Sequence, residues 1–309
     1  MKKICIITIY LGNLPKYFNL WLQSCQFNSS IDFCIVTDQE VKNLPSNVQS
    51  IKMNLLQIKK LAENKLGEEV CLKTPYKLCD YKPMYGLFFE DYLKEYDFWG
   101  HCDIDLIFGD IRKFVTEEIL NKYNKIYHLG HLSLYKNDEF TKHAFKLDGS
   151  LRGDYKLAIS TDKITIFDEI YGILEIFKKQ GIPVYSTFDF ADIDFTRERV
   201  TAYPIKNYPT QLFCYNNGKC LRYFAVGNEI REEEFVYIHM QKRIFVNTVT
   251  DCKMFAIAPH RFISISRDEI TVSRILEINP YMSKFLEELE SFCKGWRYRI
   301  IRKLKGTTL

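Results

Sequence analysis

Two aspartates one residue apart, Asp103 and Asp105, are the residues of this sequence best suited to hold a metal ion. They end the aromatic and apolar run that begins at Tyr96, which predicts a strand. In an extended segment both carboxylates share one face, while Ile104 turns into apolar surroundings. Such close carboxylates repel unless a cation lies between them, so the pair predicts a Mn²⁺ or Mg²⁺ site open to phosphate oxygens. The alternative is a strand end followed by an ordinary polar turn.

Two later segments also place polar groups directly after apolar runs. The run from Phe235 predicts a strand that ends at His239, with Lys242 close behind. His239 could complete a metal site and Lys242 could neutralise a diphosphate. The alternative for His239 is a buried imidazole held by a backbone carbonyl.

Asp168 and Glu169 follow the strand-like residues 164–167. Acidic residues favour the first turn of a helix, which is one explanation of this pair. The other is a carboxylate that accepts a proton or a hydrogen bond from a sugar hydroxyl. His128 and His131, on a predicted strand over 126–135, would point to opposite faces, so at least one is interpreted as an ordinary strand residue.

The order of predicted elements indicates an α/β fold. Strand 3–10, helix 16–26 and strand 31–37 form a parallel βαβ opening, and such sheets bind ligands at the carboxyl ends of their strands. Thr8, Tyr10 and Asp38 would lie at that edge. The first turn lacks G-x-G-x-x-G, which disfavours a dinucleotide site. Further helices are predicted over 51–66, 83–96, 111–123, 138–145 and 170–181, and further strands over 164–167, 183–190, 220–226 and 235–239.

The predicted fold class is a mixed, mainly parallel sheet flanked by helices, with a C-terminal helical extension. The expected division is a catalytic domain over 1–275 and a helical tail over 276–309. Composition agrees, since 47% hydrophobic and 27% charged residues among 309 are typical of a soluble globular protein. A net charge of +4 is too small to indicate nucleic-acid binding. Ten cysteines without a C-x-x-C pair indicate reduced thiols in the cytoplasm.

The C-terminal segment 294–305 is basic and lacks acidic residues, with Trp296 near its start. A basic amphipathic segment of this kind predicts peripheral contact with an anionic membrane at the inner face of the cytoplasmic membrane. The alternative is a solvated terminal helix that docks through its apolar stripe.

A resemblance to a known family lies in four runs of the sequence: 77–86, 96–105, 167–169 and 237–243. Together they resemble a bacterial family of glycosyltransferase-like proteins (DUF6625-like), similar to the GT-A superfamily and often associated with capsule, O-antigen or lipopolysaccharide synthesis. The similarity covers most of residues 1–250. The D-x-D segment and the segment from His239 to Arg243 are its most specific parts.

The resemblance implies roles for individual positions. Asp103 and Asp105 match the D-x-D pair that holds a divalent metal and the diphosphate of a nucleotide sugar. His239 falls where a late metal ligand occurs, and Lys242 falls where a phosphate-binding cation follows.

Further positions take weaker roles from the same resemblance. Thr8, Tyr10 and Asp38 fall where the nucleotide base and ribose bind, and Lys82 falls where it could contact the donor. Asp168 or Glu169 corresponds to an acceptor-side acidic residue, in a motif that leaves retention or inversion open.

The predicted function is transfer of a sugar from a nucleotide-diphosphate donor to a saccharide or lipid-linked acceptor, with Mn²⁺ or Mg²⁺ as cofactor. One alternative is a sugar nucleotidyltransferase or another metal-dependent nucleotide enzyme. A nucleotidyltransferase would carry a Gly-rich basic loop after the first strand, whereas residues 11–16 offer one Gly and one Lys. The other alternative is a non-catalytic carbohydrate-binding protein.

Overall fold

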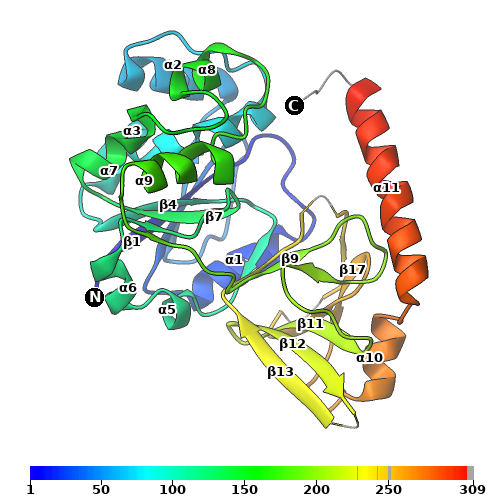
Figure 1. The fold of residues 1–309 in the computed structure, drawn as a ribbon. Coiled ribbons are helices and arrows are strands. Elements are labelled where there is room, and N and C mark those ends of the chain that lie inside the picture. Colours follow the sequence, from blue (N-terminus) through cyan, green and yellow to red (C-terminus); the bar gives the residue numbers. More distant parts are fainter. Residues whose placement is uncertain (228, 242, 250–251, 305–309) are drawn as a thin grey trace.

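The structure, a computed structural model, describes residues 1–304 apart from 228, 242 and 250–251. Its centre is a seven-stranded sheet in the order β3-β2-β1-β4-β7-β6-β8 (Figure 1). The strands are β1 (Ile4–Ile9), β2 (Asp32–Thr37), β3 (Val48–Lys52), β4 (Phe98–Cys102), β6 (Lys125–Ile126), β7 (Leu132–Lys136) and β8 (Val184–Tyr185). Neighbours are parallel except that β7 runs antiparallel to β4 and β6. The predicted mixed, mainly parallel sheet is confirmed.

Helices cover both faces of this sheet. On one face Cys5 and Ile7 of β1 pack in a core with α2 (Leu55–Leu66), α3 (Tyr85–Phe88) and α9 (Glu175–Lys179). On the other face Ile4 and Ile6 pack with α1 (Phe18–Phe27), α5 (Ile111–Phe114) and α6 (Glu117–Lys122). Burial on both faces explains why β1 is apolar except at Thr8, which is itself buried. The remaining helices here are α4 (Glu90–Leu93), α7 (Glu139–His143) and α8 (Tyr155–Ser160).

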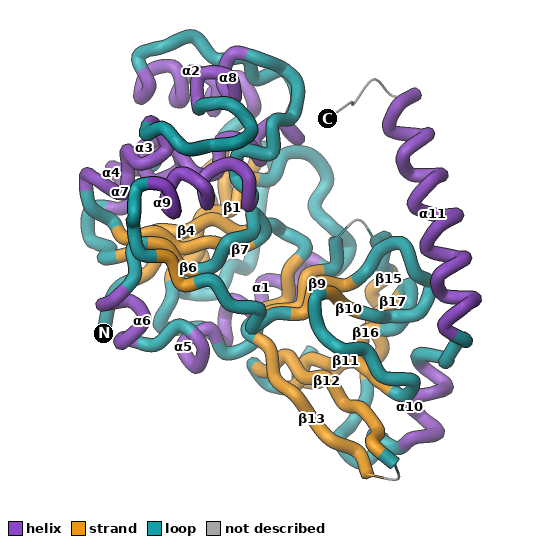
Figure 2. The backbone as a smooth tube through the Cα atoms, viewed as in Figure 1, coloured by secondary structure: helices purple, strands orange, loops and turns teal. Residues whose placement is uncertain are grey.

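The described part of the protein has two further, smaller sheets beside the central one. A four-stranded sheet has the order β10 (Ala202–Tyr203), β9 (Ala191–Ile193), β14 (Tyr237–His239) and β5 (Leu106–Phe108). A six-stranded sheet has the order β13 (Glu229–Phe235), β12 (Lys219–Val226), β11 (Gln211–Asn216), β16 (Met254–Ile257), β17 (Arg261–Ser264) and β15 (Val246–Asn247). Figure 2 shows the small sheet between the central sheet and the six-stranded one. The sequence predicted only parts of β12 and of the segment 235–239 in this region.

Two helices close the described chain. Ile275 and Ile278 of α10 (Val272–Ile278) pack against the six-stranded sheet, and α11 (Lys284–Leu304) follows. The predicted C-terminal helical extension is confirmed, whereas the division at 275 stays a prediction. Among the helices of the described residues, none has the length and apolar character that a bilayer-spanning helix needs. All ten cysteines lie in the described part, and none of them forms a disulfide there.

Several predicted elements are broken where the chain approaches the site. The helix expected over 83–96 is a 3₁₀ helix (Pro75–Met84) followed by the short α3 and α4. The helix expected over 111–123 is likewise two short helices, α5 and α6. The strand expected over 126–135 was wrong, because Tyr127 has a φ of 64° and a turn separates β6 from β7. Residues 164–167 form no strand; they lead into a π-helical turn (Ile170–Leu174).

Candidate active site

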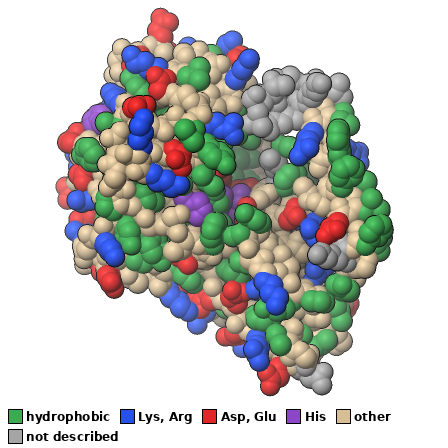
Figure 3. Space-filling view, viewed as in Figure 1, with side chains coloured by type: hydrophobic (Ala, Val, Ile, Leu, Met, Phe, Trp, Pro, Cys, Tyr) green, Lys and Arg blue, Asp and Glu red, His purple; other side chains and the backbone are tan. Residues whose placement is uncertain are grey.

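A cavity of about 800 Å³ opens at the carboxyl ends of β1 and β4. Its volume lies within the ~300–1,000 Å³ typical of small-molecule sites. Figure 3 shows histidine side chains in the hollowed centre of the molecule. The charged and imidazole side chains that line the cavity are Lys82, Asp103, Asp105, His131, Asp168, Glu169, Asp192, His239 and Arg243.

The D-x-D aspartates lie in a turn between β4 and β5 rather than in an extended strand. Backbone hydrogen bonds fix the turn: Asp103 N donates to His131 O over 3.0 Å, and Met240 N donates to Asp105 O over 2.9 Å. Ile104 is buried in the core, as predicted. The turn therefore delivers both carboxylates to the cavity, although the extended geometry assumed from the sequence was wrong.

Strand pairing brings His239 to the same turn. In β14, His239 lies opposite Leu106 of β5 on one side and opposite Asp192 of β9 on the other. His239 Nε2 is 3.4 Å from Asp105 Oδ1, and Nδ1 is 2.8 Å from Asp192 Oδ1. Burial alone would lower the pKa of His239, but Asp105 and Asp192 raise it to about 10.

The donor atoms of this group suit a divalent cation. Asp103, Asp105 and His239 each offer one ligand atom, and these atoms lie within 4.8 Å of one another. Carboxylate oxygens with one imidazole are ligands that Mn²⁺ accepts. The Asp192 carboxylate at Nδ1 of His239 is the carboxylate–imidazole arrangement found behind many metal-bound histidines. The residues present therefore fit a metal site.

Lys82 connects the aspartate pair to the other acidic group. Its Nζ lies 2.7 Å from Asp103 Oδ1 and 3.3 Å from Asp168 Oδ2, and it donates to Gly130 O over 2.9 Å. Burial would lower the pKa of Lys82, but Asp103 and Asp168 outweigh it and hold this pKa well above its usual value. Lys82 is thus a fixed cation at the inner wall of the cavity, where a donor contact was predicted.

Asp168 and Glu169 lie on the same inner wall. Burial raises the pKa of Asp168 to about 8 despite the Lys82 cation, and burial also raises the pKa of Glu169. Gly130 passes directly over them, since a Cβ there would lie 2.3 Å from Asp168 Oδ2. Both carboxylates therefore face the cavity from a tightly packed loop.

A buried ion pair holds the segment that leads to Asp168. Asp80 accepts hydrogen bonds from the backbone N–H groups of Thr165 (2.9 Å) and Phe167 (3.0 Å). Lys77 Nζ lies 2.7 Å from Asp80 Oδ2 and donates to Lys163 O over 2.6 Å. Both charged side chains are almost completely buried, so this pair fixes residues 163–167 from beneath.

The sequence analysis did not name Asp192, and it gave His131 no role in the site. Asp192 lies on the short strand β9, which no long apolar pattern marks, and it contacts His239. His131 stacks on His239 with ring centroids 4.5 Å apart, and Tyr237 OH is 2.7 Å from its Nδ1. Burial lowers the pKa of His131 well below its usual value. The turn that separates β6 from β7 places His131 beside the aspartates, and the continuous strand predicted over 126–135 did not include this turn.

The residues predicted to hold the nucleotide are placed differently. Tyr10 lines the cavity. Thr8 is buried, with its hydroxyl 2.7 Å from Cys102 Sγ, and it is not among the described residues that line the cavity. Asp38 accepts from Gly12 N over 2.9 Å and so holds the first turn rather than lining the cavity. Lys242 lies outside the described residues. The nucleotide contacts of all four stay predictions.

A comparison with protein families identifies the chain. The model of a family described as "Family of unknown function (DUF6625)" matches residues 6–266. The chain belongs to this family. A search of curated proteins finds no match.

Solved structures of glycosyltransferases have a distant likeness to this DUF6625 protein. The galactosyltransferase LgtC, in complex with donor and acceptor sugar analogues, is 12% identical with a TM-score of 0.32, over 61% of this chain and 75% of that one. An active-site mutant of LgtC is 11% identical with a TM-score of 0.35, over 61% and 74%. The glycosyltransferase GlyE of Streptococcus pneumoniae TIGR4 is 11% identical with a TM-score of 0.33, over 61% and 46%. These likenesses establish no shared activity.

Proposed function

We propose that this protein is a metal-dependent glycosyltransferase of GT-A type, which transfers a sugar from a nucleoside-diphosphate donor to a saccharide or lipid-linked acceptor. The observation that carries the proposal is the convergence of Asp103, Asp105 and His239 with Lys82 in one cavity of suitable volume. A donor diphosphate needs cations beside it, and the acceptor hydroxyl needs a proton acceptor. The cavity has candidates for both.

In the proposed reaction the bond between the sugar C1 and the diphosphate oxygen breaks, and the leaving diphosphate keeps the electron pair. Asp103, Asp105 and His239 would hold Mn²⁺ or Mg²⁺, which supplies a Lewis acid for that negative charge. Lys82 is a fixed cation beside Asp103 and adds to the positive field at the same wall.

The acceptor hydroxyl forms the new bond to C1 and releases its proton. Asp168 or Glu169 accepts it in our proposal, because both line the cavity and burial raises the pKa of each, which strengthens the ionised form as a base. Tyr10 at the carboxyl end of β1 lines the cavity where a nucleotide base could stack.

The biological setting is also part of the proposal. We place the reaction in the cytoplasm, where nucleotide sugars are available. We also propose that it contributes to the synthesis of a bacterial surface polysaccharide such as capsule or lipopolysaccharide. The basic segment 294–305 is proposed to bring the protein to the inner face of the membrane, where a lipid-linked acceptor resides.

The test is a panel of nucleotide sugars with and without Mn²⁺. A donor that binds should raise the melting temperature in a Mn²⁺-dependent way, because stabilisation follows ligand occupancy. The same donor should then be hydrolysed slowly without acceptor and release nucleoside diphosphate. Stabilisation without hydrolysis or transfer would indicate a carbohydrate- or nucleotide-binding protein. Release of nucleoside monophosphate or pyrophosphate would indicate the rival nucleotide enzymes.

A further inference from the structure

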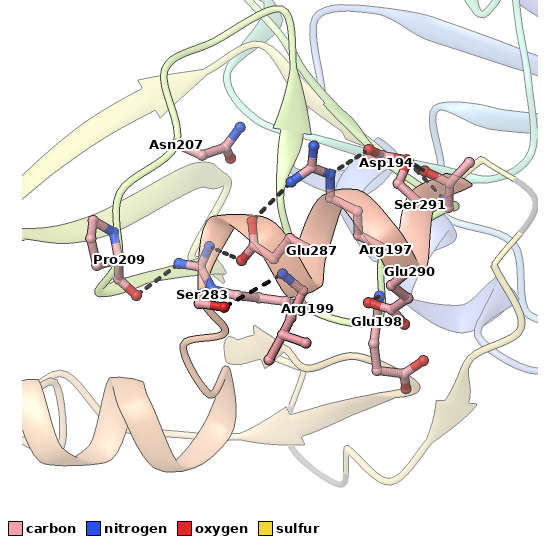
Figure 4. A network of polar contacts seen from close by, with 12 residues as sticks. Asp194, Arg197, Glu198, Arg199, Asn207, Pro209, Ser283, Glu287, Glu290 and Ser291 are labelled. Carbon is pink, nitrogen blue, oxygen red and sulfur yellow. Dashed lines mark hydrogen bonds and ion pairs between the residues drawn. The ribbon is translucent and has the colours of Figure 1, made fainter. Parts of the chain in front are cut away.

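The inner face of α11 is attached to the rest of the protein by ion pairs. Glu287 accepts hydrogen bonds from Arg197 Nη1 (2.8 Å) and Arg199 Nη1 (3.0 Å), both in the loop that follows β9. Figure 4 shows Glu287 between these two arginines, with Arg197 also reaching Asp194. Glu287 and Arg199 are buried, so this end of the helix is held firmly.

The attachment continues along the helix. The hydroxyls of Thr196 and Ser291 are 2.7 Å apart, and one turn further Lys294 Nζ lies 2.7 Å from Glu198 Oε2. Residues 287, 291 and 294 recur at helical spacing, so they form one face. That face is turned inward, which fixes the opposite face outward.

The outward face carries an exposed apolar stripe. Its members are Phe285, Leu289, Phe292, Trp296 and Ile300, whose exposed fractions run from 50% to 73%. Their spacing of three or four residues keeps them on one side over about 22 Å of helix. Figure 3 shows apolar side chains along this rim of the molecule. The stripe begins well before the basic segment 294–305 and includes residues that segment does not contain.

Charge beside the stripe favours an anionic partner. Arg297 and Arg299 are exposed on the second half of the helix, and the sequence from 294 to 305 has no acidic residue. Within the described part of α11, Glu288 is the single exposed acidic side chain. An outward apolar stripe flanked by arginines is the pattern of a helix that lies in a lipid interface.

A second copy of the chain is a poorer occupant. A stripe about 22 Å long and about 10 Å wide covers roughly 200 Å². A stable protein interface buries about 800 Å² on each partner. Pairing two stripes would also bring like-charged arginines together.

We propose that the outward face of α11, from Phe285 to Ile300, lies in the surface of an anionic lipid bilayer. The membrane contact itself does not depend on the proposed function. Only its purpose does, which is to hold the cavity beside a lipid-linked acceptor. Tyr298, predicted from the sequence as part of the membrane segment, instead contacts Phe195 with ring centroids 5.3 Å apart. The structure thus separates the inward part of that segment from the lipid-facing part.

The protein contains a natural reporter for this contact. Trp21 and Trp99 are fully buried, whereas Trp296 is 51% exposed on the stripe. On phosphatidylglycerol vesicles its emission should shift to shorter wavelength, and brominated acyl chains should quench it. Phosphatidylcholine vesicles should produce neither change.

Variants that keep Trp296 identify the face. Leu289→Ser with Phe292→Ser should weaken binding to phosphatidylglycerol vesicles at least tenfold, whereas Phe140→Ser, an equally exposed phenylalanine on α7, should not. Arg297→Gln and Arg299→Gln should each weaken it about fivefold. Equal binding by the stripe variant and the Phe140 variant overturns the proposal, as does equal binding to both lipids.

Sedimentation tests the remaining occupant. A monomer that binds the vesicles supports the proposal, and a dimer that the stripe variant dissociates overturns it. None of these measurements uses a donor sugar. Their failure therefore leaves the glycosyltransferase proposal intact, and an inactive protein that still binds vesicles counts against that proposal alone.

Discussion

At the scale of single residues, the candidate site is defined by which charges neutralise one another. Asp103 has one carboxylate oxygen on Lys82, and Asp105 faces His239. Without a metal ion, Lys82 neutralises Asp103 and the imidazolium of His239 neutralises Asp105, and neither cation occupies the whole carboxylate. A metal ion held by Asp105 and His239 would replace the proton on Nε2 of His239. The remaining oxygens are free to hold a cation in the cavity.

We predict that Asp103→Ala or Asp105→Ala abolishes almost all sugar transfer while the fold is retained. Loss of one group that stabilises the leaving charge costs about 3 kcal/mol of barrier, or ~10²-fold in rate. The matched control is Asp148→Ala, whose carboxylate is exposed and paired with Lys179. Steady-state rates with and without EDTA, on variants checked by circular dichroism, test this. A folded variant with wild-type turnover in EDTA would contradict the metal assignment.

The acidic pair on the inner wall gives a second prediction. Asp168→Asn and Glu169→Gln should keep donor affinity, and the residue that accepts the proton should lose ~10²–10⁴-fold in transfer when changed. Glu175→Gln, in the first turn of α9, is the control. Donor binding by calorimetry and transfer rates are compared. Unchanged transfer in both amide variants would leave these residues only a role at the start of the helical segment.

Lys125 gives a pH-dependent prediction. It is fully buried, its Nζ donates to Tyr127 O (2.8 Å) and Ser133 Oγ (2.6 Å), and burial lowers its pKa to about 7. In the unfolded chain its pKa is about 10.4, so between pH 7 and 10 the unfolded state binds more protons. The contribution of this group to the free energy of unfolding therefore rises with pH, by up to ~1.4 kcal/mol per unit.

The measurement is urea unfolding at pH 7, 8 and 9. Lys125→Met removes this titration, so the variant should gain less stability than the wild type across the series. Parallel pH profiles for the two proteins would show that Lys125 is not neutral in the folded state.

At the scale of elements, the site depends on short segments held by distant partners. The segment before Asp168 has no strand or helix of its own, and Ile166 within it has a φ of 58°, which is unfavourable for a β-branched residue. The backbone N–H groups of Thr165 and Phe167 donate hydrogen bonds to the Asp80 carboxylate instead. The position of the proposed base thus rests on the buried pair of Asp80 with Lys77.

We predict that Asp80→Asn lowers the free energy of unfolding by about 3–5 kcal/mol, because it leaves the buried Lys77 without its counter-charge. Asp162→Asn is the control from the same segment: its pair with Lys73 is exposed, and such pairs contribute about 0–1 kcal/mol. Urea unfolding compares the two. Hydrogen exchange of residues 163–168 should quicken only in the Asp80 variant, and equal stability of the two variants would refute the role given to Asp80.

At the scale of the whole molecule, the sequence predicted the parts with strong local patterns. β1, α1, β2 and α2 lie close to the predicted ranges. Short apolar runs mark the two strands, and helical patterns mark the two helices. Asp103, Asp105 and His239 meet at one cavity, and their role as metal ligands stays a prediction.

What the sequence did not predict depends on long-range packing. The helix expected after Pro83 is interrupted at Phe89, between α3 and α4. Within α3, Gly86 lies against Trp99; a Cβ on Gly86 would be 2.3 Å from the indole ring. The six-stranded sheet pairs strands as distant as β11 and β16, for which periodicity gives no partner. Asp192 enters the site only through the pairing of β9 with β14.

The pairing of β14 with β5 also sets the order in which the site can be completed during synthesis. A nascent chain that has reached Val236 already contains both aspartates and Lys82, but it still lacks the imidazole of His239. The next three residues supply that imidazole and, in the same step, join the later half of the protein to the earlier one. The proposed metal site is therefore completed only after most of the polypeptide has been made.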